Sequence, residues 1–141
     1  MLTLYPSVLL VEDDDIDAEA VIRAFKFHHV PYPLLHMVDG LEALDVLRKR
    51  HRQTLTHPYL ILLDLNMPRM GGLEFLKTIR QDAYLKGSIV FVMTTSNREE
   101  DLTAAYKYNV AGYILKEKVV NFGELIQLLV HYQTLIQWPI A

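Results

Sequence analysis

The chain has 141 residues, of which 51% are hydrophobic and 22% are charged, and its formal net charge is -3. This length and balance are typical of one soluble globular domain, here 1–141, with a core of its own. The absence of cysteine excludes disulfides, zinc–thiolate sites and thiol catalysis. There is no signal-peptide pattern and no apolar run of about 18 residues, so we expect a cytoplasmic protein without membrane insertion.

Apolar runs alternate with longer amphipathic segments, which is the pattern of repeated strand–helix units. The predicted strands cover 7–12, 34–38, 59–64, 88–94 and 111–115. The predicted helices cover 14–28, 40–52, 72–82, 98–108 and 121–137. Side chains able to cap free helix amides precede four of these helices: Asp13 or Asp14, Asp39, Asn97 and Asn121. The basic stretch 48–52 is expected to be a solvated helix end rather than a nucleic-acid patch.

Three predicted strands are apolar on both faces, as central strands covered by helices on each side are: 8–11, 60–63 and 89–93. Five strand–helix units with right-handed crossovers predict an α/β fold, a three-layer doubly wound (βα)5 sandwich of the flavodoxin-like type. The simplest arrangement is a five-stranded parallel sheet of order 2-1-3-4-5. Strands one and three are then adjacent at the switch point, where ligands bind outside the carboxyl ends.

The last predicted helix and its tail, about 121–141, carry more apolar residues than a one-sided surface helix needs. Core spacing is followed by Phe122, Leu125, Ile126, Leu129 and Val130, and the stripe is widened by Leu128, Tyr132, Leu135, Ile136 and Trp138-Pro139-Ile140. The tail either folds back on its own core or is buried in a homodimer. We expect the homodimer, because a large exposed apolar patch rarely goes unused.

Acidic side chains stand at the ends of the two most apolar strands. Asp64 follows the run 59–63, and Glu12 and Asp13 follow the run 8–11. A carboxylate at the tip of a buried strand is costly unless it binds something. In a parallel sheet these two strand ends would be neighbours. We therefore predict three carboxylates in one crevice, a site for a hard divalent cation and for phosphate chemistry.

Each residue of this kind also has a purely structural explanation when it is taken alone. Asp13 could be only a helix cap, and Asp64 could belong only to a strand-to-loop turn. Thr94 suits a strand end, and Lys116 could simply be solvated. Their joint occurrence at four strand ends favours a functional site.

The chain resembles a response-regulator receiver domain along essentially its whole length. The resemblance is carried by Val11-Glu12-Asp13-Asp14, Leu63-Asp64-Leu65-Asn66-Met67-Pro68, Gly72, Thr94 and Lys116. It implies a two-component phosphorelay protein that accepts a phosphoryl group from a histidine kinase onto Asp64. Such a protein catalyses its own phosphorylation and slow dephosphorylation, and it is not a turnover enzyme in the usual sense.

The resemblance also implies the roles of the other site residues. Asp13, Asp64 and the backbone carbonyl of Asn66 would bind Mg²⁺ or another divalent cation such as Mn²⁺, with Glu12 acting through a metal-bound water. Lys116 would pair with one phosphoryl oxygen, and the Thr94 hydroxyl would bond another.

A switch is the further implication of the resemblance. Phosphoryl on Asp64 draws Thr94 inward, and Tyr113 on the fifth strand follows it. The face built from helix four, strand five and helix five then changes its preference for protein partners. Because the chain ends after helix five, we expect no output domain and no direct contact with nucleic acid.

The sequence departs from the common receiver pattern after the strand-five lysine, where Glu117 replaces the usual proline. A cis peptide before a residue other than proline costs about 2.5–4 kcal/mol, so we expect a trans bond here. With Thr94-Thr95-Ser96 before the acidic run 99–101 and the aromatic-proline tail, the chain is similar to small regulators that partner cyanobacterial and bacterial phytochromes. That similarity implies a red-light-sensing histidine kinase as phosphodonor and a homodimer.

Two alternative functions belong to other classes. A pseudo-receiver would be a binding module with an inactive site, which the intact Asp13, Asp64, Thr94 and Lys116 argue against. A phosphatase with an aspartate nucleophile usually carries a second aspartate two residues later. Asn66 occupies that position and cannot serve as a general acid.

Overall fold

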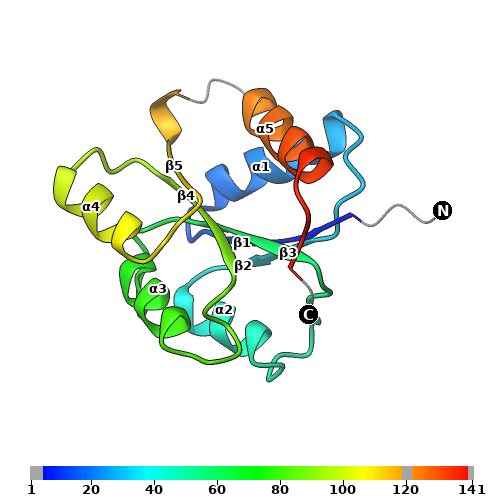
Figure 1. The fold of residues 1–141 in the computed structure, drawn as a ribbon. Coiled ribbons are helices and arrows are strands. Elements are labelled where there is room, and N and C mark those ends of the chain that lie inside the picture. Colours follow the sequence, from blue (N-terminus) through cyan, green and yellow to red (C-terminus); the bar gives the residue numbers. More distant parts are fainter. Residues whose placement is uncertain (1–4, 119–121, 140–141) are drawn as a thin grey trace.

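A parallel five-stranded sheet lies between two layers of helices in the computed structural model, which describes residues 5–118 and 122–139 (Figure 1). The strands are β1 (Ser7–Val11), β2 (Leu34–Met37), β3 (Tyr59–Leu63), β4 (Ile89–Thr94) and β5 (Gly112–Leu115). The helices are α1 (Asp15–Phe27), α2 (Gly40–Leu47), α3 (Gly72–Arg80), α4 (Glu99–Lys107), the short 3-10 helix η1 (Lys116–Lys118) and α5 (Gly123–Leu135). The sheet order is β2-β1-β3-β4-β5, which confirms the predicted topology.

The side chains of β1 alternate between the two faces of the sheet and so contact both helical layers. Successive strand side chains point to opposite faces of a sheet. Leu9 and Val11 pack in the core that α2, α3 and α4 cover. Val8 and Leu10 pack in the core on the other face, beneath α1 and α5. Figure 1 shows the same division, with α1 and α5 together on one side of the sheet.

The register of β1 and β3 positions the acidic residues predicted at their ends. Val11 is level with Leu63 in this parallel pair. Glu12 and Asp64, each one residue further on, therefore leave the sheet side by side. On the other side of β3, β4 and β5 pair Thr94 with Leu115, so Lys116 follows at the same edge.

Two of the expected helix caps are confirmed. Asp14, rather than Asp13, caps α1, and its Oδ1 accepts hydrogen bonds from the amides of Ile16 (2.9 Å) and Asp17 (3.0 Å). Asp39 caps α2 by accepting a hydrogen bond of 2.9 Å from the amide of Glu42. Since Asp14 does the capping, the Asp13 carboxylate is left for other contacts.

Other helix ends differ from the predictions. Helix α2 ends at Leu47 rather than at 52, because the backbone enters the left-handed region at Lys49 (φ 59°), a common way for a helix to end. Most of the basic stretch therefore follows α2. The predicted cap Asn97 was also wrong: α4 begins one residue later, with Arg98 at the N-cap and no side-chain cap bond. Asn121 lies outside the described residues.

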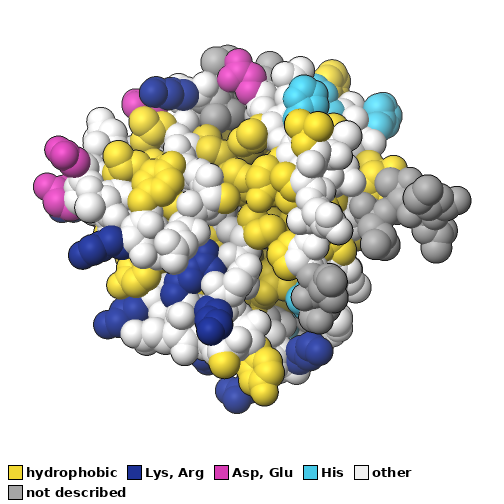
Figure 2. Space-filling view, viewed as in Figure 1, with side chains coloured by type: hydrophobic (Ala, Val, Ile, Leu, Met, Phe, Trp, Pro, Cys, Tyr) yellow, Lys and Arg dark blue, Asp and Glu magenta, His cyan; other side chains and the backbone are white. Residues whose placement is uncertain are grey.

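The tail after α5 folds back on the protein's own core as far as it is described. The Trp138 ring packs edge-on against Tyr132 at a centroid distance of 5.8 Å, and Tyr132 packs in the same way against Phe91 at 5.3 Å. Other apolar side chains of α5 stay outside, with Leu128 42% and Leu135 83% exposed. Hydrophobic side chains also gather between α4 and α5 on the face seen in Figure 2. Ile140 lies outside the described residues.

No described helix combines the length and the apolar character that a membrane crossing requires. The Lys116–Glu117 peptide is trans, as predicted. The only cis peptide bond among the described residues is His57–Pro58.

Candidate functional site

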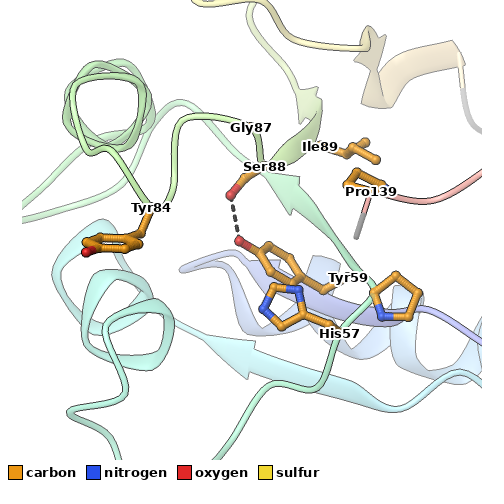
Figure 3. A pocket seen from close by; sticks show the side chains of 8 residues that line it. His57, Tyr59, Tyr84, Gly87, Ser88, Ile89 and Pro139 are labelled. Carbon is orange, nitrogen blue, oxygen red and sulfur yellow. Dashed lines mark hydrogen bonds between the residues drawn. The ribbon is translucent and has the colours of Figure 1, made fainter. Parts of the chain in front are cut away.

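A small cleft lies at the amino ends of β3 and β4, at the sheet edge opposite the acidic residues. Its volume is about 150 Å³, and it is lined by His57, Pro58, Tyr59, Tyr84, Gly87, Ser88, Ile89 and Pro139. Figure 3 shows the Tyr59 hydroxyl beside the Ser88 hydroxyl, and their oxygens are 2.6 Å apart. No carboxylate lines this cleft within the described part of the chain, so it does not suit cation or phosphoryl chemistry.

The carboxyl edge of the sheet brings the three predicted acids together. Carboxylate oxygens of Glu12, Asp13 and Asp64 all lie within 4.8 Å of one another. Glu12 is completely buried and Asp64 is 7% exposed, whereas Asp13 is exposed. The cluster is therefore open to solvent on one side and enclosed by protein on the other.

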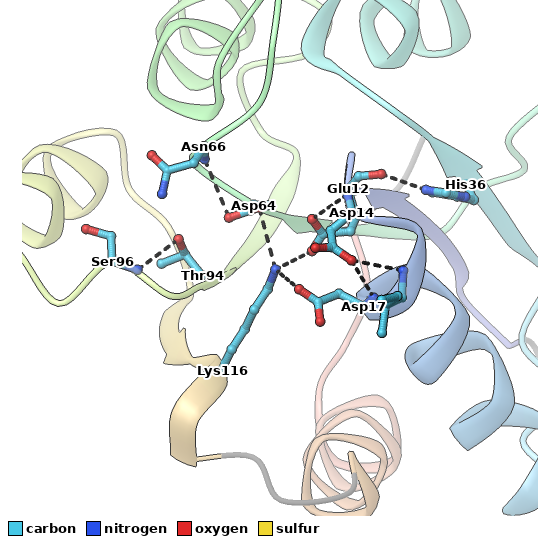
Figure 4. A network of polar contacts seen from close by, with 10 residues as sticks. Glu12, Asp14, Asp17, His36, Asp64, Asn66, Thr94, Ser96 and Lys116 are labelled. Atoms are coloured by element: carbon cyan, nitrogen blue, oxygen red, sulfur yellow. Dashed lines mark hydrogen bonds and ion pairs between the residues drawn. The ribbon is translucent and has the colours of Figure 1, made fainter.

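Lys116 enters this cluster from the start of η1 (Figure 4). Its Nζ lies 2.6 Å from Glu12 Oε1, 2.7 Å from Asp17 Oδ2 and 3.5 Å from Asp64 Oδ2. The lysine side chain is only 9% exposed, so the ammonium is a fixed part of the site. The structure thus brings Lys116 to the acids, as the sequence predicted.

Burial and charge shift the pKa values of this group in a consistent way. Burial raises the pKa of Glu12 to about 8, because the contact with Lys116 offsets only part of the lost hydration. Burial alone would lower the pKa of Lys116, but its bonds to Asp17 and Glu12 outweigh that loss and raise the pKa above its ordinary value. The lysine therefore stays a cation.

The donor set fits a hard divalent cation. Glu12 Oε1 is buried, and its close partner in the described chain is the Lys116 ammonium at 2.6 Å. An ionised carboxylate can accept from several partners, so this side chain can also face a bound cation. Three carboxylates and no sulfur or clustered imidazole ligand match the preference of Mg²⁺ and Mn²⁺ for oxygen. Glu12, Asp13 and Asp64 could therefore hold such an ion.

Asn66 and Thr94 flank Asp64 on the side away from Glu12 (Figure 4). The backbone amide of Asn66 donates to Asp64 Oδ1 over a long 3.5 Å. Thr94 is completely buried at the end of β4, and its Oγ1 accepts a hydrogen bond of 3.3 Å from the amide of Ser96. Both residues thus lie where the sequence placed them.

Tyr113 is connected to this edge through Ser96. The Tyr113 hydroxyl donates a hydrogen bond of 2.9 Å to the carbonyl oxygen of Ser96. The Ser96 hydroxyl donates in turn to Asp101 Oδ2 on α4 at 2.5 Å. One residue therefore contacts Thr94, the aromatic of β5 and the first turn of α4.

Two contacts at the site were not predicted from the sequence. Asp17 reads as an ordinary acid in the first turn of a helix, where negative charge is favourable anyway. His36 Nε2 lies 2.7 Å from the carbonyl oxygen of Glu12, although the spacing of His36 suggested no ligand role. No pattern along the chain reveals either contact, because each joins residues that only the sheet brings together.

The loop after Asp64 is held by close contacts on both sides. The amide of Gly72 donates to the carbonyl oxygen of Leu65 at 2.9 Å. The Arg69 guanidinium, on a residue with φ 62°, donates from Nε to Asp39 Oδ2 at 2.6 Å. Since Asp39 is buried at the N-cap of α2, the loop that carries Asn66 is fixed to the helical layer.

A family model described as the response regulator receiver domain matches residues 8–129. The chain belongs to this family. Response regulator Rcp1 of Synechocystis sp. is 36% identical over 123 residues, which make up 86% of this chain and 82% of Rcp1. The resemblance predicted from the residues is therefore confirmed, and the receiver is a signalling protein of the two-component type.

Solved structures of receivers give the same result. The Mn²⁺-bound form of Rcp1 has a TM-score of 0.78 at 30% identity and covers 96% of this chain and 100% of its own. The phosphorylated cyanobacterial phytochrome response regulator RcpA has a TM-score of 0.79 at 30% identity, over 97% and 100%. A response regulator in red light signalling of R. palustris has a TM-score of 0.83 at 29% identity, over 97% and 100%. The receiver is thus similar to phytochrome-associated regulators.

Proposed function

We propose that this receiver accepts a phosphoryl group on Asp64 from a phosphohistidine of a sensor histidine kinase. The observation that carries the proposal is the setting of Asp64. Its carboxylate is nearly buried at the end of β3, with two further acids within 4.8 Å and the Lys116 ammonium at 3.5 Å. Positioned charges of both signs are the main requirement of phosphoryl transfer.

In this transfer, a carboxylate oxygen of Asp64 attacks the phosphorus atom of the phosphohistidine. An O–P bond forms and gives an acyl phosphate, while the P–N bond breaks and its electron pair returns to the imidazole. Lys116 binds one phosphoryl oxygen as a fixed cation, and the Thr94 hydroxyl donates to another. Hydrolysis of the acyl phosphate later restores the carboxylate without a second protein.

Glu12, Asp13 and Asp64 would hold Mg²⁺ or Mn²⁺ together with the backbone carbonyl of Asn66, with Glu12 acting through water. When bound, the cation offsets the repulsion among the acids and neutralises charge on the phosphoryl oxygens. The clustering of three carboxylates and the oxygen-only ligands support this assignment.

Signalling would pass from Thr94 through Tyr113 to the face of α4, β5 and α5. Ser96 supports this route, since it contacts both residues and also binds Asp101 of α4. The face is also partly apolar, with Leu102 39% and Tyr106 49% exposed on α4. We propose protein contact as the output and a phytochrome kinase of the cytoplasm as the phosphodonor, which the named relatives support.

Mass spectrometry of the intact protein tests the phosphoryl transfer. With Mg²⁺ and acetyl phosphate we expect a single phosphate adduct that hydroxylamine removes, as it removes acyl phosphates. Chelation with EDTA should abolish the adduct, because three acids then repel the incoming anion. If neither acetyl phosphate nor a phosphorylated histidine kinase gives an adduct, the chain is a pseudo-receiver and the proposal is wrong.

Turnover of a phosphomonoester would instead support the aspartate-nucleophile phosphatase. Asn66 lies two residues after Asp64 and offers no acidic proton to the leaving group. We therefore expect no steady-state release of phosphate from such a substrate.

The apolar surface of α5 supports a proposed homodimer. Leu135 is 83% exposed although Trp138 beside it packs on the protein's own core. We expect Leu135→Glu to weaken self-association by at least about tenfold, as removal of an apolar contact at an interface does. Light scattering across a concentration series measures this, with Leu41→Glu as the control, because Leu41 is exposed on α2, which covers the other face of the sheet. An unchanged molar mass in both variants would place any interface elsewhere.

A further inference from the structure

Asp17 makes a close contact with Lys116. The proposed phosphoryl transfer assigns no role to this contact. Its Oδ2 accepts a hydrogen bond of 2.7 Å from Lys116 Nζ, a much shorter contact than the 3.5 Å between Lys116 and Asp64. Asp17 lies in the first turn of α1 and stands outside the cluster of Glu12, Asp13 and Asp64. It is therefore a partner of the lysine and not a candidate ligand of the cation.

The other two carboxylate partners of Lys116 belong to the cation site. Glu12 and Asp64 are in ion-pair contact with the ammonium, and both are members of the acidic cluster. A divalent cation at these carboxylates repels an ammonium only a few ångströms away. Within the described chain, Asp17 is the one carboxylate partner of Lys116 that is not also a candidate ligand of the cation.

A lysine without such a partner would move to solvent, because its four-carbon chain is flexible and its ammonium is strongly hydrated. Asp17 is well placed to prevent this. Its helix is fixed at the N-terminus by the Asp14 cap, and it packs on the sheet through buried residues such as Ala18 and Val21. Figure 4 shows the Lys116 ammonium between Asp17 on one side and Asp64 on the other.

We infer that Asp17 is a positioning residue, which holds the Lys116 ammonium beside Asp64 while a divalent cation occupies Glu12, Asp13 and Asp64. The inference rests on the proposed phosphoryl transfer, in which Lys116 must wait within reach of the phosphoryl oxygens. Asp17 forms no bond to the phosphoryl group and exchanges no proton. It acts only by keeping a flexible cation in one place.

Lysine acylation with a water-soluble reagent, read by mass spectrometry, tests this without any phosphoryl transfer. In the wild type, Lys116 should be labelled slowly both with EDTA and with saturating Mg²⁺. In Asp17→Ala, addition of Mg²⁺ should raise the labelling rate at Lys116 about fivefold or more, since a lysine released to solvent loses its proton more readily and its neutral amine is then acylated. Asp15→Ala is the matched control, because it removes an exposed carboxylate from the same helical turn.

Phosphorylation kinetics with acetyl phosphate at saturating Mg²⁺ provide the second readout. Asp17→Ala should lower the maximal rate about tenfold through the loss of positioning, while Asp17→Asn, which still accepts a hydrogen bond, should recover most of it. In a Lys116→Ala background, the same Asp17 substitutions should change the rate by less than about twofold, because coupled residues are not additive.

Two results would overturn the inference. One is Lys116 labelling in Asp17→Ala that Mg²⁺ does not increase beyond the Asp15→Ala level. The other is a rate loss that is the same with and without Lys116. A failure of the proposed function looks different, because the wild type itself would then give no phosphate adduct.

Discussion

Asp64→Asn is expected to abolish phosphate uptake while the protein stays folded. The amide keeps the shape of the side chain but has no anionic oxygen for attack on phosphorus. The affinity for Mg²⁺ should also fall by at least about tenfold, because even a change at a residue that only supports a metal ligand typically costs that much. Intact-protein mass spectrometry and calorimetric titration with Mg²⁺ measure the two effects.

Although Asp64→Asn should lose phosphate uptake and Mg²⁺ affinity, its free energy of unfolding without a cation should rise. Without a cation, Asp64 adds negative charge to a cluster in which burial already raises the pKa of Glu12. Neutralising Asp64 relieves repulsion, so we expect unfolding in EDTA to need about 1 kcal/mol more free energy. Asp45→Asn, at an exposed position of α2, is the control and should change neither uptake nor stability. An adduct that persists in Asp64→Asn would move the nucleophile to another residue.

Gly72→Ala is expected to cost both stability and phosphorylation rate. A Cβ at Gly72 would lie 2.5 Å from the carbonyl oxygen of Asp64 and 2.7 Å from the Cα of Leu65. These are backbone atoms and cannot turn away as a side chain can. Alanine is the better helix former by about 1 kcal/mol, but such overpacking typically costs about 1–3 kcal/mol. We expect a net loss of up to about 2 kcal/mol in urea unfolding.

The displaced backbone carries Asp64, so this variant should also be phosphorylated more slowly, by about tenfold for a sub-ångström misplacement. Gly87→Ala is the matched control, because a Cβ there meets nothing within 4 Å. It should be neutral or slightly stabilising, since it restricts the unfolded chain. If the two glycine variants unfold at the same urea concentration, α3 does not depend on this close approach.

Most of the fold could be predicted because the signals are local and repeated. Apolar runs such as 60–63 are short, are apolar on both faces and are followed by amphipathic segments, which leaves few alternatives to a doubly wound sheet. The acids Glu12 and Asp64 were informative for the same reason. Each follows directly on a buried strand, and the sheet order then places them side by side.

The parts that could not be predicted depend on single backbone turns or on distant partners. Between Leu47 and residue 52 there is no glycine or proline, so nothing local indicates that the helix ends before Lys49. The contact of Asp17 with Lys116 joins residues 99 positions apart. The packing of Trp138 on the core is also set by tertiary fit, which a hydrophobic stripe cannot distinguish from an interface with a second chain.

The edge-on aromatic contacts of Trp138 give the protein an intrinsic fluorescence probe. Trp138 is the only tryptophan of the chain, and it lies against Tyr132, which in turn contacts Phe91 of β4. Indole emission shifts to the red when the ring moves from an apolar contact into water. Release of the tail from the sheet would therefore be visible as a fluorescence change in the unlabelled protein, on the timescale of the event itself.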